Sequence, residues 1–275
     1  MKKMMMRALG LLAAGTAFAT PVALQAHRQW MMPSATVLSG EDVWVTVDAA
    51  VSNDLFYFEH QPMRLEGITA VAPDGSDAAI EHGATGRYRS TFDVHLTKPG
   101  TYKIVSAGQG VFGSYKLNGE EKRLPRGLSA DKLVGAIPAG ATDVKLMETQ
   151  NRNEVFVTVG APTETVLKPT GKGLELAPVT HPNDLVAGEK ATFQFLIDGK
   201  PAAGLGVTVI PGGIRYRNAL GQMDLKADAE GKVQIDWPQP GMYWLNASVS
   251  DKRTSLPGAT ERRANYVTTL EVLAP

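Results

Sequence analysis

Short segments that alternate between apolar and polar residues are the feature that most restricts the fold of this chain. In the first half these segments are residues 43–47, 69–71, 88–96, 101–105 and 154–159. They are rich in β-branched and aromatic residues, and turn signals such as Pro73-Asp74-Gly75 separate them. A period of two places successive side chains on opposite faces of a strand. The pattern predicts an antiparallel, immunoglobulin-like β-sandwich with one short helix near 129–136.

The second half of the chain begins a new series of such segments after an interruption. Hydrophobic periodicity lapses at residues 160–174, which are rich in Pro, Gly and Thr. The strands predicted after this gap are 191–197, 206–210, 233–237, 242–249 and 264–272. We therefore predict an all-β protein of two tandem antiparallel sandwiches, an N-terminal domain at 27–165 and a C-terminal domain at 175–275.

Composition excludes several classes of function. Lys plus Arg and Asp plus Glu number 28 each in 275 residues, so the chain lacks the basic excess that nucleic acid or an anionic membrane would attract. The absence of cysteine excludes disulfides and thiolate ligands. We find no nucleophile elbow, phosphate-binding glycine loop, zinc-protease helix or dinucleotide fingerprint, so we predict no catalytic residues and no enzyme activity.

The first 26 residues have the features of a secretory signal peptide. Three basic residues precede an apolar stretch at 8–18 that is too short to span a bilayer. Leu24-Gln25-Ala26 is a candidate cleavage site for signal peptidase. Cleavage after Ala26 would make His27 the first residue of a periplasmic protein with no membrane insertion. Cleavage after Ala19 fits the small-x-small rule better and would begin the chain at Thr20 instead.

A histidine at the amino terminus would be a bidentate metal chelate. Its α-amine titrates near pH ~8 and its imidazole near ~6.5, so both release protons readily to a metal. Without other ligands, His27 would be only a polar first residue. His60 follows an aromatic stretch at 56–58 and is the second candidate ligand, although an aromatic strand with a polar end is also common packing.

Asp93 and His95 are two residues apart on a predicted strand and therefore share a face, with Cα atoms about 6 to 7 Å apart. An amino-terminal histidine with an Asp-x-His pair resembles the copper site of periplasmic copper-resistance proteins, and this resemblance implies His27, Asp93 and His95 as ligands. The alternative is an ordinary solvated strand face. The complete predicted metal set is His27, His60, Asp93 and His95.

Three other features have structural interpretations. His82 lies beside Gly83 in a predicted loop and is expected to be solvated, and His181 precedes Pro182 and is expected to hydrogen-bond its own turn. The segment 215–217, Arg-Tyr-Arg, is expected to place two guanidinium groups on one side of a strand, as a binding patch or as an interface ion-pair cluster.

Motifs in the second half resemble known families. Residues 198–201, 228–233 and 241–245 are similar to the prealbumin-like, carboxypeptidase regulatory-like module. Residues 174–176, 180–185 and 212–217, with Ala26-His27 near Trp30, resemble an exported bacterial family of uncharacterised function, the DUF4198-like proteins. That resemblance implies an association with uptake of nickel, cobalt or other metals.

The leading hypothesis is a non-enzymatic periplasmic protein that binds a divalent transition metal, which would be nickel, cobalt, copper or iron. Its partners would be the metal ion and a membrane transporter or outer-membrane receptor component. A second hypothesis is a copper-dependent oxidative enzyme with an amino-terminal histidine brace. A third is a structural or adhesive pair of modules that binds no metal. The sequence does not choose the ion.

Overall fold

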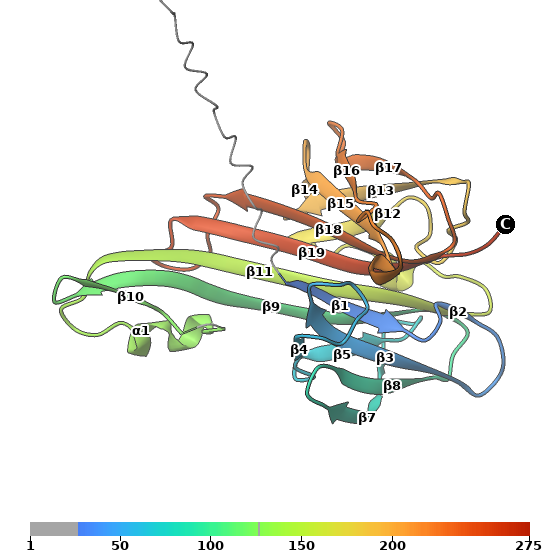
Figure 1. The fold of residues 1–275 in the computed structure, drawn as a ribbon, viewed down its shortest axis with the longest axis horizontal. Helices are drawn as coiled ribbons and strands as arrows, with labels where there is room; N and C mark the ends of the chain where they lie inside the picture. The colour runs from blue at the N-terminus through green and yellow to red at the C-terminus, as the bar shows by residue number, and fades with distance from the viewer. Residues whose placement is uncertain (1–26, 126) are drawn as a thin grey trace, which may run out of the picture.

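The computed structural model describes residues 27–125 and 127–275, so the predicted signal peptide lies outside the described residues. The fold is built almost entirely from strands in three sheets (Figure 1). No described helix is long and apolar enough to cross a membrane. The predicted all-β class with antiparallel sheets is confirmed.

Sheet A has five strands in the order β1-β3-β8-β7, with β4 also pairing with β3. Its strands are β1 (Arg28–Pro33), β3 (Val43–Ser52), β4 (Gln61–Pro62), β7 (Ile80–Thr85) and β8 (Ser90–Leu96). All the pairings in this sheet are antiparallel. Along β8 the apolar residues are buried and the residues between them are partly exposed, as the period of two predicts.

Sheet B has ten strands and runs through both halves of the protein, in the order β16-β15-β18-β19-β11-β9-β5-β6 with β10 on β9 and β2 on β11. Its strands are β2 (Val37–Leu38), β5 (Ile68–Val71), β6 (Asp77–Ala78), β9 (Gly100–Leu117), β10 (Glu120–Arg123), β11 (Thr142–Val159), β15 (Gly206–Pro211), β16 (Met223–Lys226), β18 (Gly241–Asp251) and β19 (Glu261–Val272).

Sheet C has four strands, β12 (Leu174–Pro178), β13 (Lys190–Ile197), β14 (Lys200–Pro201) and β17 (Lys232–Asp236). A tight turn at Asp198 and Gly199, both with positive φ, joins β13 to β14, and Asp-Gly is a preferred pair for such a hairpin. The helical segments are short: η1 (Ala130–Lys132), α1 (Leu133–Ala136), η2 (Thr165–Leu167) and η3 (Ile214–Tyr216). The predicted helix at 129–136 thus corresponds to η1 and α1.

Two large hydrophobic cores lie on opposite faces of sheet B. Sheet A covers the first core, which includes Val45, Phe92 and Ile104. Sheet C covers the second core, which includes Phe193 and Trp237. Complete burial of side chains of this size contributes about 1.5–3 kcal/mol each, so these cores hold the three sheets together.

Sheet B joins the two halves through a parallel pairing of β11 with β19, from Met147 opposite Glu261 to Glu154 opposite Thr268. The sequence predicted two sandwiches in tandem, whereas the structure gives them one common sheet. The predicted limit at 165 falls at the start of η2, after β11, and the limit at 175 falls inside β12, and both limits stay a prediction. Figure 1 shows β9 and β11 side by side, extending well beyond sheet A.

Candidate functional site

The structure brings His27 and His60 together at one end of β3. His27 directly precedes β1, and Arg28 of that strand lies opposite Ser52. His60 directly precedes β4, where Gln61 lies opposite Val51 on the other side of β3. The two imidazole rings are stacked, with centroids 3.7 Å apart and planes 7° from parallel. Both residues are exposed, so this pair is accessible from solvent.

A buried tryptophan organises the loop that carries His60. Trp30 is completely buried, and its Nε1 donates a 2.8 Å hydrogen bond to Ser52 Oγ. The ring makes an edge contact with Phe56, at a centroid distance of 5.4 Å, and a tilted contact with Phe58 at 5.7 Å. Phe56 has a φ of 64°, a backbone conformation that a bulky residue adopts only when its surroundings hold it there. The loop therefore has a defined shape.

The charged residues next to the two histidines in sequence, Arg28 and Glu59, hydrogen-bond to the backbone of the loop at Asn53 and Asp54. Glu59 Oε1 accepts hydrogen bonds from the backbone N–H groups of Asn53 and Asp54, both at 2.8 Å. Arg28 donates to the carbonyl oxygen of Asn53 at 2.6 Å. Burial lowers the pKa of Arg28 and the charge of Asp54 opposes this, but a guanidinium stays protonated at neutral pH. The imidazole nitrogens of His27 and His60 accept or donate no hydrogen bond among the described residues.

The second predicted pair, Asp93 and His95, lies on the exposed face of sheet A as expected, but its polar atoms are already engaged. Asp93 Oδ1 accepts a hydrogen bond from Thr46 Oγ1 at 2.6 Å, and its Oδ2 lies 3.0 Å from His82 Nδ1. His95 Nε2 lies 2.6 Å from Asp42 Oδ1. The two side chains thus contact different partners.

An indole ring also covers this second group. Trp44, directly opposite His95 on β3, stacks on the His95 ring at a centroid distance of 4.2 Å and an angle of 4°. His82 lies 5.9 Å from the same indole. Sequence reasoning predicted His82 to be solvated in a loop. Its side chain is exposed, as predicted, but the residue lies on β7, with a φ of 51° at a register shift, and no local sequence signal indicated its contact with Asp93.

One ion cannot be bound by all four predicted residues. His95 lies opposite Trp44, near the start of β3, whereas Arg28, which follows His27, lies opposite Ser52 at its end. Eight strand residues at about 3.3 Å each separate these positions by roughly 26 Å. The arrangement implied by the copper-resistance resemblance, with His27, Asp93 and His95 around one copper, is therefore not formed.

Within residues 27–125 and 127–275 no group of three or more His, Cys, Asp or Glu side chains is arranged to hold a metal. The His27–His60 pair provides two imidazoles. A third nitrogen would be available there only if His27 carried a free α-amine.

The remaining sequence candidates have structural roles. His181 Nδ1 accepts a hydrogen bond from the N–H of Asn183 at 3.1 Å, as the turn interpretation predicted, and burial lowers the pKa of its imidazole. The expectation of a strand at 215–217 was wrong, because Arg215 and Tyr216 lie in η3 and Arg217 directly follows it. Arg217 donates to four backbone carbonyl oxygens there, and Arg215 lies over the Tyr57 ring at 4.5 Å.

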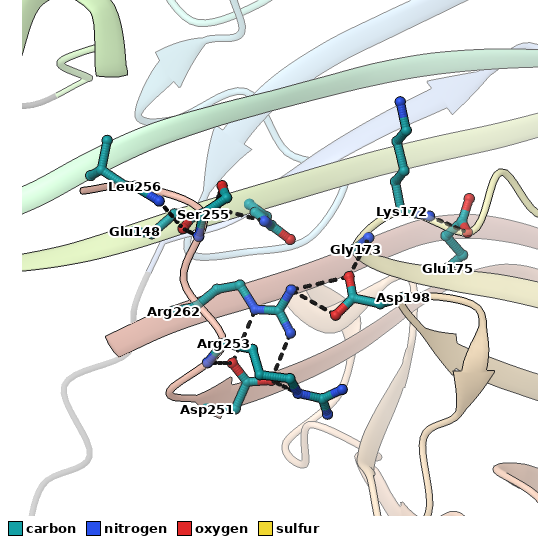
Figure 2. Close-up of polar contacts among 11 residues, drawn as sticks. Glu148, Lys172, Gly173, Glu175, Asp198, Asp251, Arg253, Ser255, Leu256 and Arg262 are labelled. Atoms are coloured by element: carbon teal, nitrogen blue, oxygen red, sulfur yellow. Dashed lines mark hydrogen bonds and ion pairs between the residues drawn. The ribbon is translucent and has the colours of Figure 1, made fainter. Parts of the chain in front are cut away.

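A buried polar network lies on the face of sheet B that sheet C covers, and Figure 2 shows its ion pairs. Arg262, 4% exposed, donates to both carboxylate oxygens of Asp251, at 3.0 and 2.6 Å, and pairs with Asp198 at 2.8 Å. The hydrogen bond from Arg262 is the main cause that lowers the pKa of Asp251. Asp198 is in the β13–β14 turn, so this network fastens sheet C to β18 and β19.

Glu148, 2% exposed, is a buried acid of that face. Burial raises the pKa of its carboxyl group, but hydrogen bonds from Gln150, Ser255 and Leu256 outweigh burial and lower it overall. The group is therefore ionised at neutral pH and accepts hydrogen bonds without donating any. Sequence reasoning did not single out this network, whose members are up to 108 residues apart.

Comparison with solved structures gave distant similarity. The D0-D1 domain of intimin is 13% identical with a TM-score of 0.21, and the match covers 88% of this chain and 97% of that one. Trypsin-activated alpha-2-macroglobulin from Escherichia coli is 11% identical with a TM-score of 0.23, covering 89% of this chain and 16% of that one. A marsupial T cell receptor is 11% identical with a TM-score of 0.22, covering 91% and 74%.

Comparison with curated proteins gave no match. A family model described as a domain of unknown function, DUF4198, matches residues 24–251. This match includes His27, His60, all of sheet A and most of sheet B. The chain belongs to the DUF4198 family.

Proposed function

We propose that this chain, processed to begin at His27, is a non-enzymatic periplasmic protein that binds one divalent transition-metal ion and serves metal uptake or handling. The contact between His27 and His60, two exposed imidazoles 33 residues apart in sequence, is the observation that carries the proposal. Nickel, cobalt, copper and iron are all candidate ions, because imidazole and amine nitrogens suit each of them.

Ring separation in the pair is compatible with a shared ion. Imidazole nitrogens bind zinc and similar ions at about 2.0–2.1 Å, so two of them around one ion are about 2.9 to 4.2 Å apart, depending on the angle at the metal. The ring centroids, 3.7 Å apart, show that the two imidazoles are neighbours, although this value is not a nitrogen–nitrogen distance. Lone pairs of parallel rings do not converge on a point, so binding requires the exposed rings to rotate about their side-chain torsions. The α-amine of His27 would be the third donor.

Binding should weaken as the pH falls, because protons compete with the metal for nitrogen ligands. The positive charge of Arg28 opposes a bound cation, whereas Asp54 and Glu59 on the neighbouring loop favour one. Both imidazoles are exposed, so a bound ion would be accessible to a membrane transporter or an outer-membrane receptor component.

The experiment compares two forms of the protein, one beginning at His27 and one with a single glycine before it. Mass spectrometry verifies each amino terminus, and isothermal titration calorimetry measures binding of Ni²⁺, Co²⁺, Cu²⁺ and Zn²⁺. We expect the added glycine to weaken binding of Co²⁺ and Zn²⁺ at least ten-fold, because it acylates the α-amine of His27. Cu²⁺ and Ni²⁺ can bind the new Gly-His terminus through its amine, amide and imidazole nitrogens, so they do not serve as the readout. Equal affinities would remove the amino-terminal chelate from the proposal.

A copper-dependent oxidative enzyme is the second candidate, because its histidine brace needs a second imidazole beside the first and His60 occupies such a position. It predicts that the Cu²⁺-loaded form consumes oxygen and releases peroxide when an external reductant is supplied. Binding without peroxide release favours the non-enzymatic function.

A further inference from the structure

Strand β9 has an open edge at residues Ala107 to Gly110. On one side β9 pairs with β11 along its whole length. On the other side β5 ends with Ile68 opposite Ser106, and the next contact is Leu128 opposite Val111. Ala107, Gly108 and Gln109 are exposed. The gap is four residues long, about 13 Å at the usual rise of a strand.

Backbone groups in this gap point toward solvent. Val111 N–H donates across the edge to Leu128 O at 2.9 Å. N–H and C=O directions alternate along a strand, so those of Ala107 and Gln109 point the same way as those of Val111. Among the described residues Ala107 and Gln109 form no backbone hydrogen bond across this edge, although the register places Gly67, the residue before β5, opposite Ala107. Proteins usually protect such edges with charges, proline or a bulge, and here Ala107, Gly108 and Gly110 leave the edge bare.

A cleft of about 260 Å³ lies beside this edge, and Gln150 and Gly173 are among its lining residues. Gln150 Nε2 donates to Glu148 Oε1 at 2.8 Å, and Gln150 Oε1 is buried with no partner. An ionised Glu148 can only accept hydrogen bonds, so the NH2 group of the Gln150 amide must face it. The amide oxygen of Gln150 is then left without a partner. Any ligand group that contacts this oxygen must be a hydrogen-bond donor.

A second cleft of about 350 Å³ is lined in part by the same edge and by Asn153. Asn153 is only 3% exposed, and its Oδ1 has no partner, while its Nδ2 lies 4.0 Å from Met63 Sδ. Successive residues of β11 face opposite sides, so Asn153 and Gln150 present their free oxygens on different faces of sheet B. An unpaired buried carbonyl costs about 1–3 kcal/mol, which a donor from a ligand would recover.

We propose that this edge binds an extended segment of a partner protein, which adds a short strand beside β9. Outward backbone groups at Ala107 and Gln109 match the two-residue repeat of a strand, as in other cases of strand addition. Alternate side chains of the segment enter the two clefts, where hydroxyl or amide donors of Ser, Thr, Asn or Gln reach Gln150 Oε1 and Asn153 Oδ1. The gap fits three to four residues.

The test uses a heptapeptide library displayed on phage, selected on the protein beginning at His27. Fluorescein-labelled copies of enriched peptides are then titrated by fluorescence polarisation. Ala107→Pro removes an outward N–H without removing a bond to β11, and we expect it to weaken binding at least ten-fold. Gly108→Val should do the same, because a Cβ there meets no atom within 4 Å and would project from the face of sheet B into the space of a cleft that Gly108 lines.

Gly206→Val is the matched control, since Gly206 is another exposed strand glycine with no atom within 4 Å of a Cβ, and it lines neither cleft. It should leave peptide affinity unchanged. Circular dichroism verifies that every variant is folded, and metal titration should be the same for all, which separates this site from His27 and His60. Failure to enrich peptides, equal affinity of Ala107→Pro and wild type, or binding of oligosaccharides in place of peptides would overturn the proposal.

Discussion

The two ends of β3 carry two groups of histidines that differ in their neighbours. At one end His82 and His95 each lie within hydrogen-bond distance of a carboxylate, and Trp44 covers the His95 ring. At the other end His27 and His60 contact each other and hydrogen-bond to no described residue. A histidine whose nitrogens are paired within the protein has less to offer an ion. Sequence reasoning selected Asp93 and His95 as metal ligands because a carboxylate lies close to a histidine. The comparison shows that at this end of β3 the carboxylates and histidines already contact other groups of the protein.

The two ends also differ in their tryptophans, and the largest effect is expected there. Trp30→Ala should lower the free energy of unfolding by about 3–5 kcal/mol, because Trp30 is fully buried and its loss leaves a cavity beneath the loop of His60. Trp44→Ala should cost less than about 1 kcal/mol, because that ring is 37% exposed. Urea unfolding followed by circular dichroism measures both. Equal losses would show that burial does not distinguish the two ends.

Metal affinity should separate the two groups directly. In the protein that begins at His27, His60→Ala should weaken binding of Cu²⁺ or Ni²⁺ at least ten-fold, because one of three nitrogen donors is lost. His95→Ala is the matched control and should change the affinity less than two-fold. Calorimetric titration at pH 7.5 measures the affinities. If His95→Ala has the larger effect, the ion binds at the other end of β3.

The half-buried His181 predicts an effect of pH on stability. Burial lowers its pKa, so the unfolded chain binds a proton more readily than the folded protein. The stability associated with neutral His181 is therefore complete above the unfolded pKa, near ~6.5, and is lost as the pH falls through the lower folded value. Between pH 7.5 and 5 the His181→Gln variant should lose less stability than wild type. Parallel losses in the two proteins would contradict this.

The smallest effect is expected at the exposed contact between Asp42 and His95, at the end of β3 where the histidines lie next to carboxylates. Asp42 is mostly exposed and Asp42→Asn should change the free energy of unfolding by less than about 0.5 kcal/mol, because water screens such pairs. Thermal unfolding at low and high salt measures the change. A larger loss would mean that the stack of His95 on Trp44 depends on this carboxylate.

Many strands were predictable because their sequence signal is local. The segments at 43–47, 88–96 and 191–197 correspond to β3, β8 and β13. The lengths of β9 and β11 were not predictable. Alternation of apolar and polar residues stops at 107–110 in β9 and at the polar residues 149–152 of β11 that pair with them. Those segments remain strands because they pair with each other. The predicted metal residues remain a hypothesis, and the structure adds that they divide into two groups.

The sequence by itself determined the β class, the turns and the alternation that places Asp93 and His95 on one face. These properties depend on residues within a few positions of one another. Only the tertiary structure decided that His27 meets His60, that His82 meets Asp93, and that β11 and β19 pair in parallel to join both halves in one sheet. Such contacts depend on strand order and register, which are set by burying both cores at once, and no short segment of the sequence encodes that requirement.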